Sequence, residues 1–375
     1  MKKFDYVIAG AGAAGLTLAY QLMGAEDNEK SILIIDKDSK SNNDRTWCFW
    51  ETEDNLFEDL VYKSWDKAAI KTSHWKKDYP LFPYRYKMIR SIDFYNYMKQ
   101  ALASDHITWL QEEVVEIKSN GHVITKSGDY LGDLVFSSLL QPDSLKTSSS
   151  NTLLQHFKGQ VIRVKEPVFD PQLATYMDFS VAQEGDCRFG YVLPFDERTA
   201  LVEYTLFNKK LLTEEAYESR LKAYIKTFTK QNYEVLEEEY GIIPMTDFPF
   251  QIKESDKVYN IGIKGGFAKP STGYTFLRGQ KILKKMANNI QKGIAPDTDL
   301  PFQTKRFKKY DATLLSVLDD KELTGEDIFG RLFQKNGIHT MFRFLDEETN
   351  LIEEMKIMST TPLFHFGKAF LKQVK

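Results

Sequence analysis

Cysteine and paired histidines are scarce in this sequence of 375 residues. The two cysteines, Cys48 and Cys187, lie far apart and outside any CxxC motif. This usage indicates buried free thiols in a reducing compartment rather than a disulfide framework. The six histidines form no HxxxH or HxH pair. The usual spacing of histidine ligands is therefore missing, and we expect no metal site.

An excess of one charge is also missing, as are internal repeats and low-complexity linkers. The formal net charge is -3, which gives no general reason to expect nucleic acid as a partner. The nearly uncharged stretch 6–25 contains four glycines, and these favour a buried strand and helix over a membrane span or signal peptide. Without a targeting segment, we expect a cytoplasmic protein.

Aromatic residues, by contrast, are abundant at 13% of the chain. Large rigid rings suit either a large core or a pocket for a long apolar ligand, and abundance alone does not separate these two uses. The length of the chain favours two closely joined domains over a single core.

A dinucleotide-binding loop, Gly-Ala-Gly-Ala-Ala-Gly, occupies 10–15. It follows the apolar run 6–9 and precedes an expected helix at 16–23, and Asp36 ends the next expected strand. Glycines let the backbone approach a pyrophosphate, a helix N-terminus stabilises its charge, and the acid binds ribose hydroxyls. This order predicts FAD, and the alternative is a glycine-rich turn without a ligand. The residues that we expect to bind the cofactor in this part of the chain are Gly10, Gly12, Ala14, Gly15, Asp36, Lys37 and Arg45.

A second glycine-rich segment at 262–274 follows an expected strand and precedes an expected helix at 275–290. Its Pro-Ser-Thr-Gly turn would aim free backbone N–H groups at an anion. Such a segment suits the far phosphate and ring of a flavin, and the alternative is a helix with a tight N-terminal turn. The expected flavin-binding residues here are Gly265, Gly266, Pro270, Ser271, Thr272, Gly273 and Tyr274.

The order of expected strands and helices predicts an α/β fold. A discontinuous Rossmann-like FAD-binding domain is interrupted by an antiparallel β-sheet substrate domain and followed by a helical C-terminal region. The expected ranges are 1–65, 90–157 and 240–300 for the FAD-binding domain, 66–89 and 158–239 for the sheet domain, and 301–375 for the helical region.

Glu203 is the candidate catalytic acid. Alternation along the expected strand 200–205 puts Leu201 and Glu203 on the same face. Burial there would raise the pKa of the carboxyl and keep it protonated, as a general acid or cation stabiliser requires. The alternative is a surface carboxylate on the exposed face of the sheet.

Short segments along nearly the whole chain carry a family resemblance. They lie at 44–50, 86–91, 175–179, 191–195, 201–205, 241–245, 270–274, 343–346 and 355–358. Together they resemble the flavin-dependent lycopene cyclases, in the bacterial lycopene β-cyclase branch. The resemblance implies a flavoprotein that closes the acyclic ends of lycopene into β-ionone rings, giving β-carotene via γ-carotene. It places the catalytic acid at Glu203.

The resemblance also implies partners. The expected cofactor is reduced FAD with NADPH or NADH as the electron source, and the reaction belongs to the intramolecular lyases of the isomerase class. Because lycopene and related acyclic carotenoids reside in lipid, we expect peripheral association with the inner face of the cell membrane, with 364–372 as a candidate contact. The expected substrate contacts are Trp47, Phe49, Tyr204 and Met245.

Two other classes of protein remain open at this point. One is a flavin-dependent monooxygenase or reductase that acts on an isoprenoid or polyene with NADPH. The other is an inactive flavoprotein that binds a carotenoid.

Three short features depart from the family pattern or imitate it. Lys264 replaces a small residue beside the glycines, and Ser137-Ser138 replaces a strand end that usually contains an acid. The acidic segment 344–349 looks like the acid motif of the plant cyclases, but its place in a helical region favours a solvated helix face.

Overall fold

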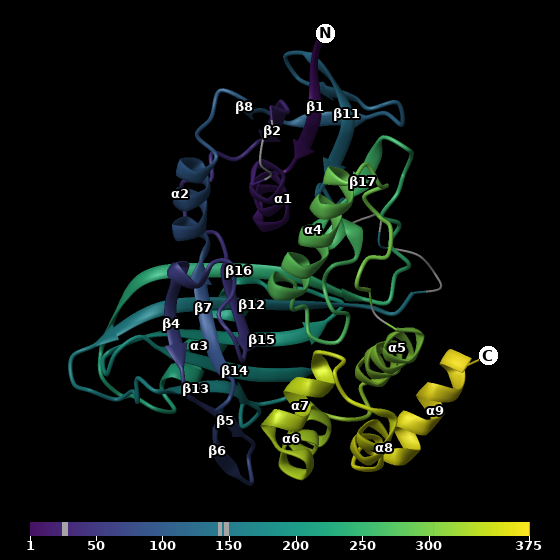
Figure 1. Ribbon diagram of the computed structural model, residues 1–375. Helices are drawn as coiled ribbons and strands as arrows, with labels where there is room; N and C mark the ends of the chain where they lie inside the picture. The colour runs from purple at the N-terminus through teal and green to yellow at the C-terminus, as the bar shows by residue number, and fades with distance from the viewer. Residues whose placement is uncertain (25–28, 142–144, 146–149, 303, 375) are drawn as a thin grey trace.

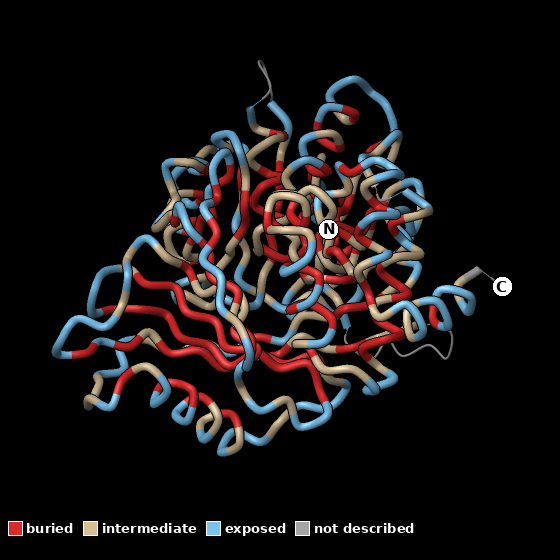
Figure 2. Tube along the Cα trace, turned by 90° about the horizontal axis from the view of Figure 1, so that it is seen from below, coloured by how far each residue is buried: buried red, intermediate tan, exposed pale blue. Residues whose placement is uncertain are grey.

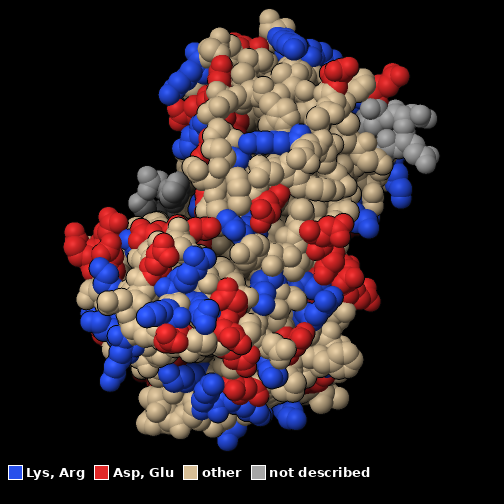
Figure 3. Space-filling view, turned by 90° about the vertical axis from the view of Figure 1, so that its left-hand side faces the viewer, with Lys and Arg blue, Asp and Glu red and all other residues tan. Residues whose placement is uncertain are grey.

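The computed structural model describes residues 1–24, 29–141, 145, 150–302 and 304–374. Figure 1 shows a sheet with flanking helices at the top, a broad sheet of long strands below it, and a group of C-terminal helices at the lower right. The face drawn in Figure 3 mixes basic and acidic side chains without a large area of one sign.

The first sheet has the mixed topology of a dinucleotide-binding domain. Among the described residues its order is β8-β2-β1-β11-β10-β9, with β17 paired to β11. The strands are β1 (Lys2–Ala9), β2 (Ile32–Asp36), β8 (Ile107–Gln111), β9 (Val114–Ile117), β10 (His122–Thr125), β11 (Asp129–Ser137) and β17 (Val258–Asn260). β1 is parallel to both β2 and β11, whereas β9, β10 and β11 form an antiparallel ribbon.

Helices from distant parts of the chain complete this domain. They are α1 (Ala13–Met23), α2 (Ser91–Ala101) and α4 (Phe276–Gln291), and α1 packs against both others. Because β17 and α4 lie far along the chain from β1, the domain is discontinuous. The expected Rossmann-like arrangement is confirmed.

The second sheet has the order β16-β12-β15-β14-β13-β5-β6 over the described residues. Its strands are β5 (Lys67–Lys71), β6 (Lys76–Pro80), β12 (Thr152–Val164), β13 (Leu173–Asp178), β14 (Cys187–Pro194), β15 (Thr199–Asn208) and β16 (Tyr233–Thr246). The pairing is antiparallel except between β5 and β13, which are parallel. β12 and β16 extend beyond the range 158–239 that we expected for this domain from the sequence, and the domain boundaries stay a prediction.

A small third sheet joins the two larger ones. It has the order β3-β7-β4, with β3 at Thr46–Glu51, β4 at Val61–Trp65 and β7 at Arg85–Arg90. β7 is antiparallel to both neighbours. Although the sequence assigned β3 and most of β7 to different domains, the two strands pair directly. The short helix η1 (Glu58–Leu60) precedes β4.

The second sheet is covered on both faces. The helix α3 (Glu214–Ile225), which the Thr213 side chain caps, packs on one face together with Val202 and Tyr204. Leu201 and Phe207 face the other way and join a core formed with the C-terminal helices. Figure 2 shows the strands of this sheet as largely buried, with exposed residues at their turns. Alternation along β15 therefore divides its side chains between two environments.

The C-terminal region is helical, as expected. Its elements are α5 (Lys305–Asp320), η4 (Glu326–Gly330), α6 (Arg331–Asn336), α7 (Ile338–Leu345), α8 (Leu351–Ser359) and α9 (Leu363–Val374). α5 contacts α9, the edge strand β16 and the adjacent strand β12. Within the described part of the chain, no helix combines the length and apolar character needed to cross a membrane.

Candidate active site

A cavity of about 1230 Å³ joins the first sheet, the second sheet and the C-terminal helices. Its lining includes Gly12 of the glycine loop, Tyr191 and Glu203 of the second sheet, and Phe366 and Phe370 of α9. Polar backbone at one part of the cavity and aromatic rings elsewhere suit a nucleotide cofactor next to an apolar substrate.

The glycine loop leaves open space where a pyrophosphate would lie. Gly10 adopts a φ of 107°, and a Cβ on Gly12 would meet nothing within 4 Å. A Cβ on Gly15 would lie 2.0 Å from the Gly10 carbonyl oxygen, so this glycine lets α1 pack closely on the loop. Asp36 accepts a hydrogen bond from the Ala11 backbone N–H at 2.7 Å, which fixes its carboxylate beside the loop.

Most of the expected nucleotide contacts are therefore gathered at one end of the cavity. The ones that line it are Gly10, Gly12, Ala14, Asp36, Lys37 and Arg45. Gly15 lies beneath the loop and outside the lining.

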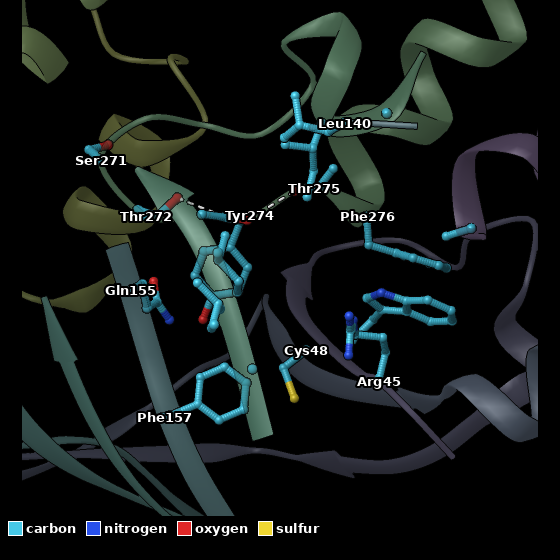
Figure 4. Close-up of a pocket in the computed structure, with 18 of the residues that line it drawn as sticks. Arg45, Cys48, Leu140, Gln155, Phe157, Ser271, Thr272, Tyr274, Thr275 and Phe276 are labelled. Atoms are coloured by element: carbon cyan, nitrogen blue, oxygen red, sulfur yellow. Dashed lines mark hydrogen bonds between the residues drawn. The ribbon is translucent and has the colours of Figure 1, made fainter. Parts of the chain in front are cut away.

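The return segment after β17 supplies a second polar wall. Its short helix η3 (Gly262–Gly265) is followed by a loop in which Ser271, Thr272 and Tyr274 line the cavity. Figure 4 shows these side chains around the same space as Gln155 and Phe157 of β12. The Ser271 hydroxyl and the Gln155 amide oxygen are buried without a hydrogen-bond partner among the described residues.

Not every expected residue of that segment reaches the cavity. Gly273, with a φ of 71°, lines it, whereas Gly265, Gly266 and Pro270 lie outside the lining. A Cβ on Gly265 would lie 2.6 Å from the Asn260 carbonyl oxygen, so this position serves close backbone packing. Open backbone at Gly12, the acid at Asp36 and the unpaired polar atoms of the return segment fit a flavin dinucleotide.

The two departures near the glycines contact each other. The Lys264 ammonium donates to the Ser137 hydroxyl at 3.3 Å and pairs with Glu254 at 3.2 Å. Ser138 is packed against Gly10, where a Cβ would lie 2.1 Å from the serine hydroxyl. The replacements therefore form one local polar network at the end of β11.

Glu203 lies on the cavity side of β15 and is 8% exposed. Burial, the charge of Glu239 and a hydrogen bond with Glu239 together raise the pKa of Glu203 well above its ordinary value. Burial and the neighbouring acid thus favour the protonated form of this carboxyl. A surface position, the alternative left open by the sequence, is wrong because the C-terminal helices cover this face of the sheet.

The two carboxyl groups meet because of strand register. Gly159 of β12 pairs with Glu203 of β15 on one side and with Glu239 of β16 on the other. A Cβ at Gly159 would lie 2.8 Å from Cγ of Glu203 and 3.0 Å from Cγ of Glu239. The missing side chain of Gly159 gives both acids room above the central strand.

A group of buried tyrosines lines the cavity beside this pair. The Tyr86 hydroxyl lies 2.5 Å from that of Tyr191 and 2.9 Å from that of Tyr274. Tyr191 also pairs with Glu203 across β14 and β15. Burial raises the pKa of all three tyrosines well above the ordinary value, so they stay neutral and present aromatic rings to the cavity.

The fold places the four expected substrate contacts in different surroundings, and not all of them line the cavity. Trp47 lines the cavity and stacks on Phe276, with ring centroids 5.4 Å apart. Phe49 stacks on the same ring but is buried outside the lining. Tyr204 points to the α3 face because it is adjacent to Glu203 on an extended strand. Met245 is fully buried in the core.

The sequence predicted a solvated helix face for the acidic segment 344–349, and the structure differs. α7 ends at Leu345, and Glu347 adopts a φ of 66° in the following turn. The Glu347 carboxylate pairs with Lys269 and Arg278, each at 3.1 Å. The segment thus connects the C-terminal helices to the return segment through buried ion pairs.

Sequence reasoning missed several residues of the cavity, notably Glu239, Gln155 and Phe157. Glu239 belongs to the acidic run 237–239, to which the sequence analysis gave no role. Alternation along β16 was the available signal, because it separates Glu239 from Glu238. Among the described residues, no group of three or more His, Cys, Asp or Glu side chains could hold a metal ion.

Comparison with solved structures supports the fold. A geranylgeranyl bacteriochlorophyll reductase-like protein from Thermoplasma acidophilum has a TM-score of 0.66 at 12% identity and covers 98% of each chain. A flavin-dependent brominase has a TM-score of 0.59 at 13% identity and covers 99% of this chain and 94% of its own. At these identities the likeness concerns the fold alone.

Comparison of sequences is more specific. A lycopene beta-cyclase from Pseudescherichia vulneris is 24% identical over 303 residues, which are 78% of this chain and 75% of that protein. The family profile described as "Lycopene cyclase protein" matches residues 5–369, nearly the whole sequence. The chain therefore belongs to the lycopene cyclase family.

Proposed function

We propose that this protein is a lycopene β-cyclase, which closes the acyclic ψ ends of lycopene to β-ionone rings and gives β-carotene by way of γ-carotene. The observation that carries the proposal is the buried carboxyl of Glu203 in an aromatic cavity that also reaches the glycine loop. Family membership and the lycopene beta-cyclase relative support it. The reaction rearranges bonds without net electron transfer and belongs to the isomerase class.

FAD is the proposed cofactor, reduced by NADPH or NADH. The glycine loop and Asp36 would hold its nucleotide part, and 271–274 would lie against its ring. When bound in reduced form, it supplies an electron-rich ring that stabilises positive charge.

Glu203 performs the proton chemistry in this proposal. Its carboxyl gives a proton to C2 of the acyclic end, which leaves a tertiary cation at C1. The C5=C6 double bond then forms the C1–C6 bond and moves the cation to C5. The carboxylate takes the proton from C6, so the carboxyl is restored and no proton is consumed.

The aromatic wall protects these cations from water. Phe157, Tyr191 and Phe207 line the cavity near Glu203. Their ring faces attract positive charge and offer no nucleophile that could trap it. A cavity wall formed largely by apolar side chains suits a long polyene.

The C-terminal helices offer a route from lipid. Leu363, Phe366 and Phe370 of α9 line the cavity, and Phe364 and Leu371 of the same helix are 76% and 65% exposed. We propose that this helix meets the membrane surface and that acyclic carotenoids enter beside it. Peripheral association with the inner face of the cell membrane would follow.

Replacing the acid tests the proposed function. We expect Glu203→Gln to keep its flavin and to lose cyclisation by about 100-fold or more, as general acid catalysis typically contributes. The wild-type protein and the variant would be expressed in lycopene-accumulating cells. Pigments would be separated by chromatography, and bound flavin would be measured by absorbance. Glu238→Gln is the matched control, because this side chain is 53% exposed and lies on β16, which β12 separates from the strand of Glu203. Full turnover by Glu203→Gln would refute the assignment.

A further inference from the structure

We propose that Glu203 and Glu239 act as one carboxyl pair that holds a single proton, with Glu239 as the positioning residue that keeps this proton on Glu203. The inference rests on the proposed function and adds a second acid to it. It arises from the pairing of β15, β12 and β16, where both acids flank Gly159.

The geometry brings the two groups together above a position that has no side chain. Residues directly opposite each other on neighbouring strands project to the same face and lie about 5 Å apart. Glu203 and Glu239 lie on β15 and β16, with β12 between these strands. Their side chains can meet because the residue between them on β12 is Gly159, which has no side chain. Both line the cavity.

The surroundings distinguish the two acids. The Thr46 hydroxyl donates a hydrogen bond to Oε2 of Glu239 at 2.6 Å, and such a donor stabilises the ionised form. Among the described residues, no such hydroxyl donor is hydrogen-bonded to Glu203. The partner of Glu203 in the pair is Glu239 itself. In the proposed pair, this difference in hydrogen bonding favours Glu203 as the acid that holds the proton.

Other titratable groups near the pair stay neutral. Cys48 of β3 and Tyr191 of β14 both lie close enough to interact with Glu203. Burial raises the pKa of each, so neither contributes charge near pH 7. Two neighbouring carboxyl groups in a buried place repel each other when both are ionised, which favours a single shared proton.

The proton balance of the reaction gives the pair its role. When Glu203 transfers its proton to C2, a C–H bond forms and both carboxylates are briefly ionised. Their combined negative charge faces the new carbocation and stabilises it. When the C6–H bond breaks, the proton returns to Glu203 and the singly protonated pair is restored.

The pH dependence of cyclisation tests this inference. Activity requires protonated Glu203, so it is present below the pKa of that group and is lost as pH rises through it. Glu239→Gln removes the neighbouring charge and lowers this pKa. We expect the alkaline limb of the pH–rate profile to move down by about one pH unit or more. Glu238→Gln should leave the profile unchanged.

A second variant separates proximity from charge. Gly159→Ala places a methyl group between the acids and forces them apart, so it should shift the alkaline limb in the same direction. If the pair acts as a unit, the double variant Gly159→Ala/Glu239→Gln shifts the profile no further than Glu239→Gln alone. Bound flavin and circular dichroism would show that each variant is folded.

Infrared spectroscopy provides a readout that does not depend on the substrate. The holoenzyme at neutral pH should show the carbonyl band of a buried protonated carboxyl group. That band should vanish in Glu203→Gln and change frequency in Glu239→Gln. An unchanged band and an unchanged pH profile in Glu239→Gln would overturn the inference. If the wild-type protein does not cyclise lycopene but the band behaves as expected, the proposed function fails and the carboxyl pair stands.

Discussion

At the scale of single residues, three glycines in the cavity region have different physical roles. Gly12 faces open space, Gly15 is enclosed by backbone, and Gly159 separates two acids. A sequence motif does not distinguish these roles, because it gives only the identity of each residue and not the atoms around it. The atoms that surround a missing Cβ decide whether a glycine serves ligand binding, packing or catalysis.

The first two glycines should respond differently to the same substitution. Gly15→Ala places a methyl group against the Gly10 carbonyl, so we expect the free energy of unfolding to fall by about 1–3 kcal/mol even without cofactor. Gly12→Ala should leave the stability of the apoprotein unchanged and weaken FAD binding, because its Cβ would enter the space for the pyrophosphate. Thermal unfolding and flavin titration of both apoproteins measure this contrast. Equal unfolding temperatures for the two variants would contradict it.

At this scale, local sequence evidence was enough to place a residue on one face of a strand or at the end of an element. Alternation along 200–205 placed Glu203 on a particular face of its strand, and the strand-loop-helix order placed Gly12 and Asp36. Glu239 could not be paired with Glu203 in this way, because cross-strand register depends on contacts between distant segments. The expectation that Tyr204 contacts substrate, by contrast, disagreed with local alternation, which puts Tyr204 on the face opposite to Glu203.

At the scale of elements, α9 connects the cavity to the surface. One side of this helix lines the cavity, while Phe364 and Leu371 remain exposed. The sequence identified the aromatic and basic character of 364–372 but could not show that the same helix borders the cavity. A helix with this division suits the transfer of an apolar molecule from lipid.

Membrane binding through α9 can be tested with two surface substitutions. We expect Phe364→Ser/Leu371→Ser to reduce flotation with liposomes, because it removes exposed apolar area without disturbing the core. Leu56→Ser/Ile294→Ser is a matched control, since these residues are 48% and 43% exposed away from α9. Equal flotation of both variants and the wild-type protein would exclude α9 as the contact.

At the scale of the whole molecule, the cofactor domain and the sheet domain share one cavity. Such a fold also suits redox enzymes, and two proteins with a similar fold are a reductase-like protein and a flavin-dependent brominase. The buried carboxyl of Glu203 in the cavity, whose pKa is raised by burial and by Glu239, suits the acid–base chemistry that we propose. The amount of reductant consumed for each product molecule distinguishes these functions.

We expect cyclisation to need NADPH only to reduce the flavin. In an anaerobic assay with limiting NADPH, the amount of cyclised product should therefore exceed the amount of NADPH oxidised. In the same assay a reductase would consume one NADPH for each product molecule, whereas a monooxygenase would form no product until O2 is admitted. A ratio of one, together with a product whose mass differs from that of lycopene, would favour the redox alternative.

The strand β12 also sets the distance between the return segment, where the cofactor would lie, and the two acids. Gln155 approaches the return segment, Phe157 packs over Gly241, and Gly159 lies between the acids, each two residues from the next. Four residues of extended chain span about 13 Å. The separation between cofactor and acid is thus set by backbone length, which point substitutions do not alter. Evolution or engineering toward a substrate that needs a different separation would have to insert or delete residues in β12.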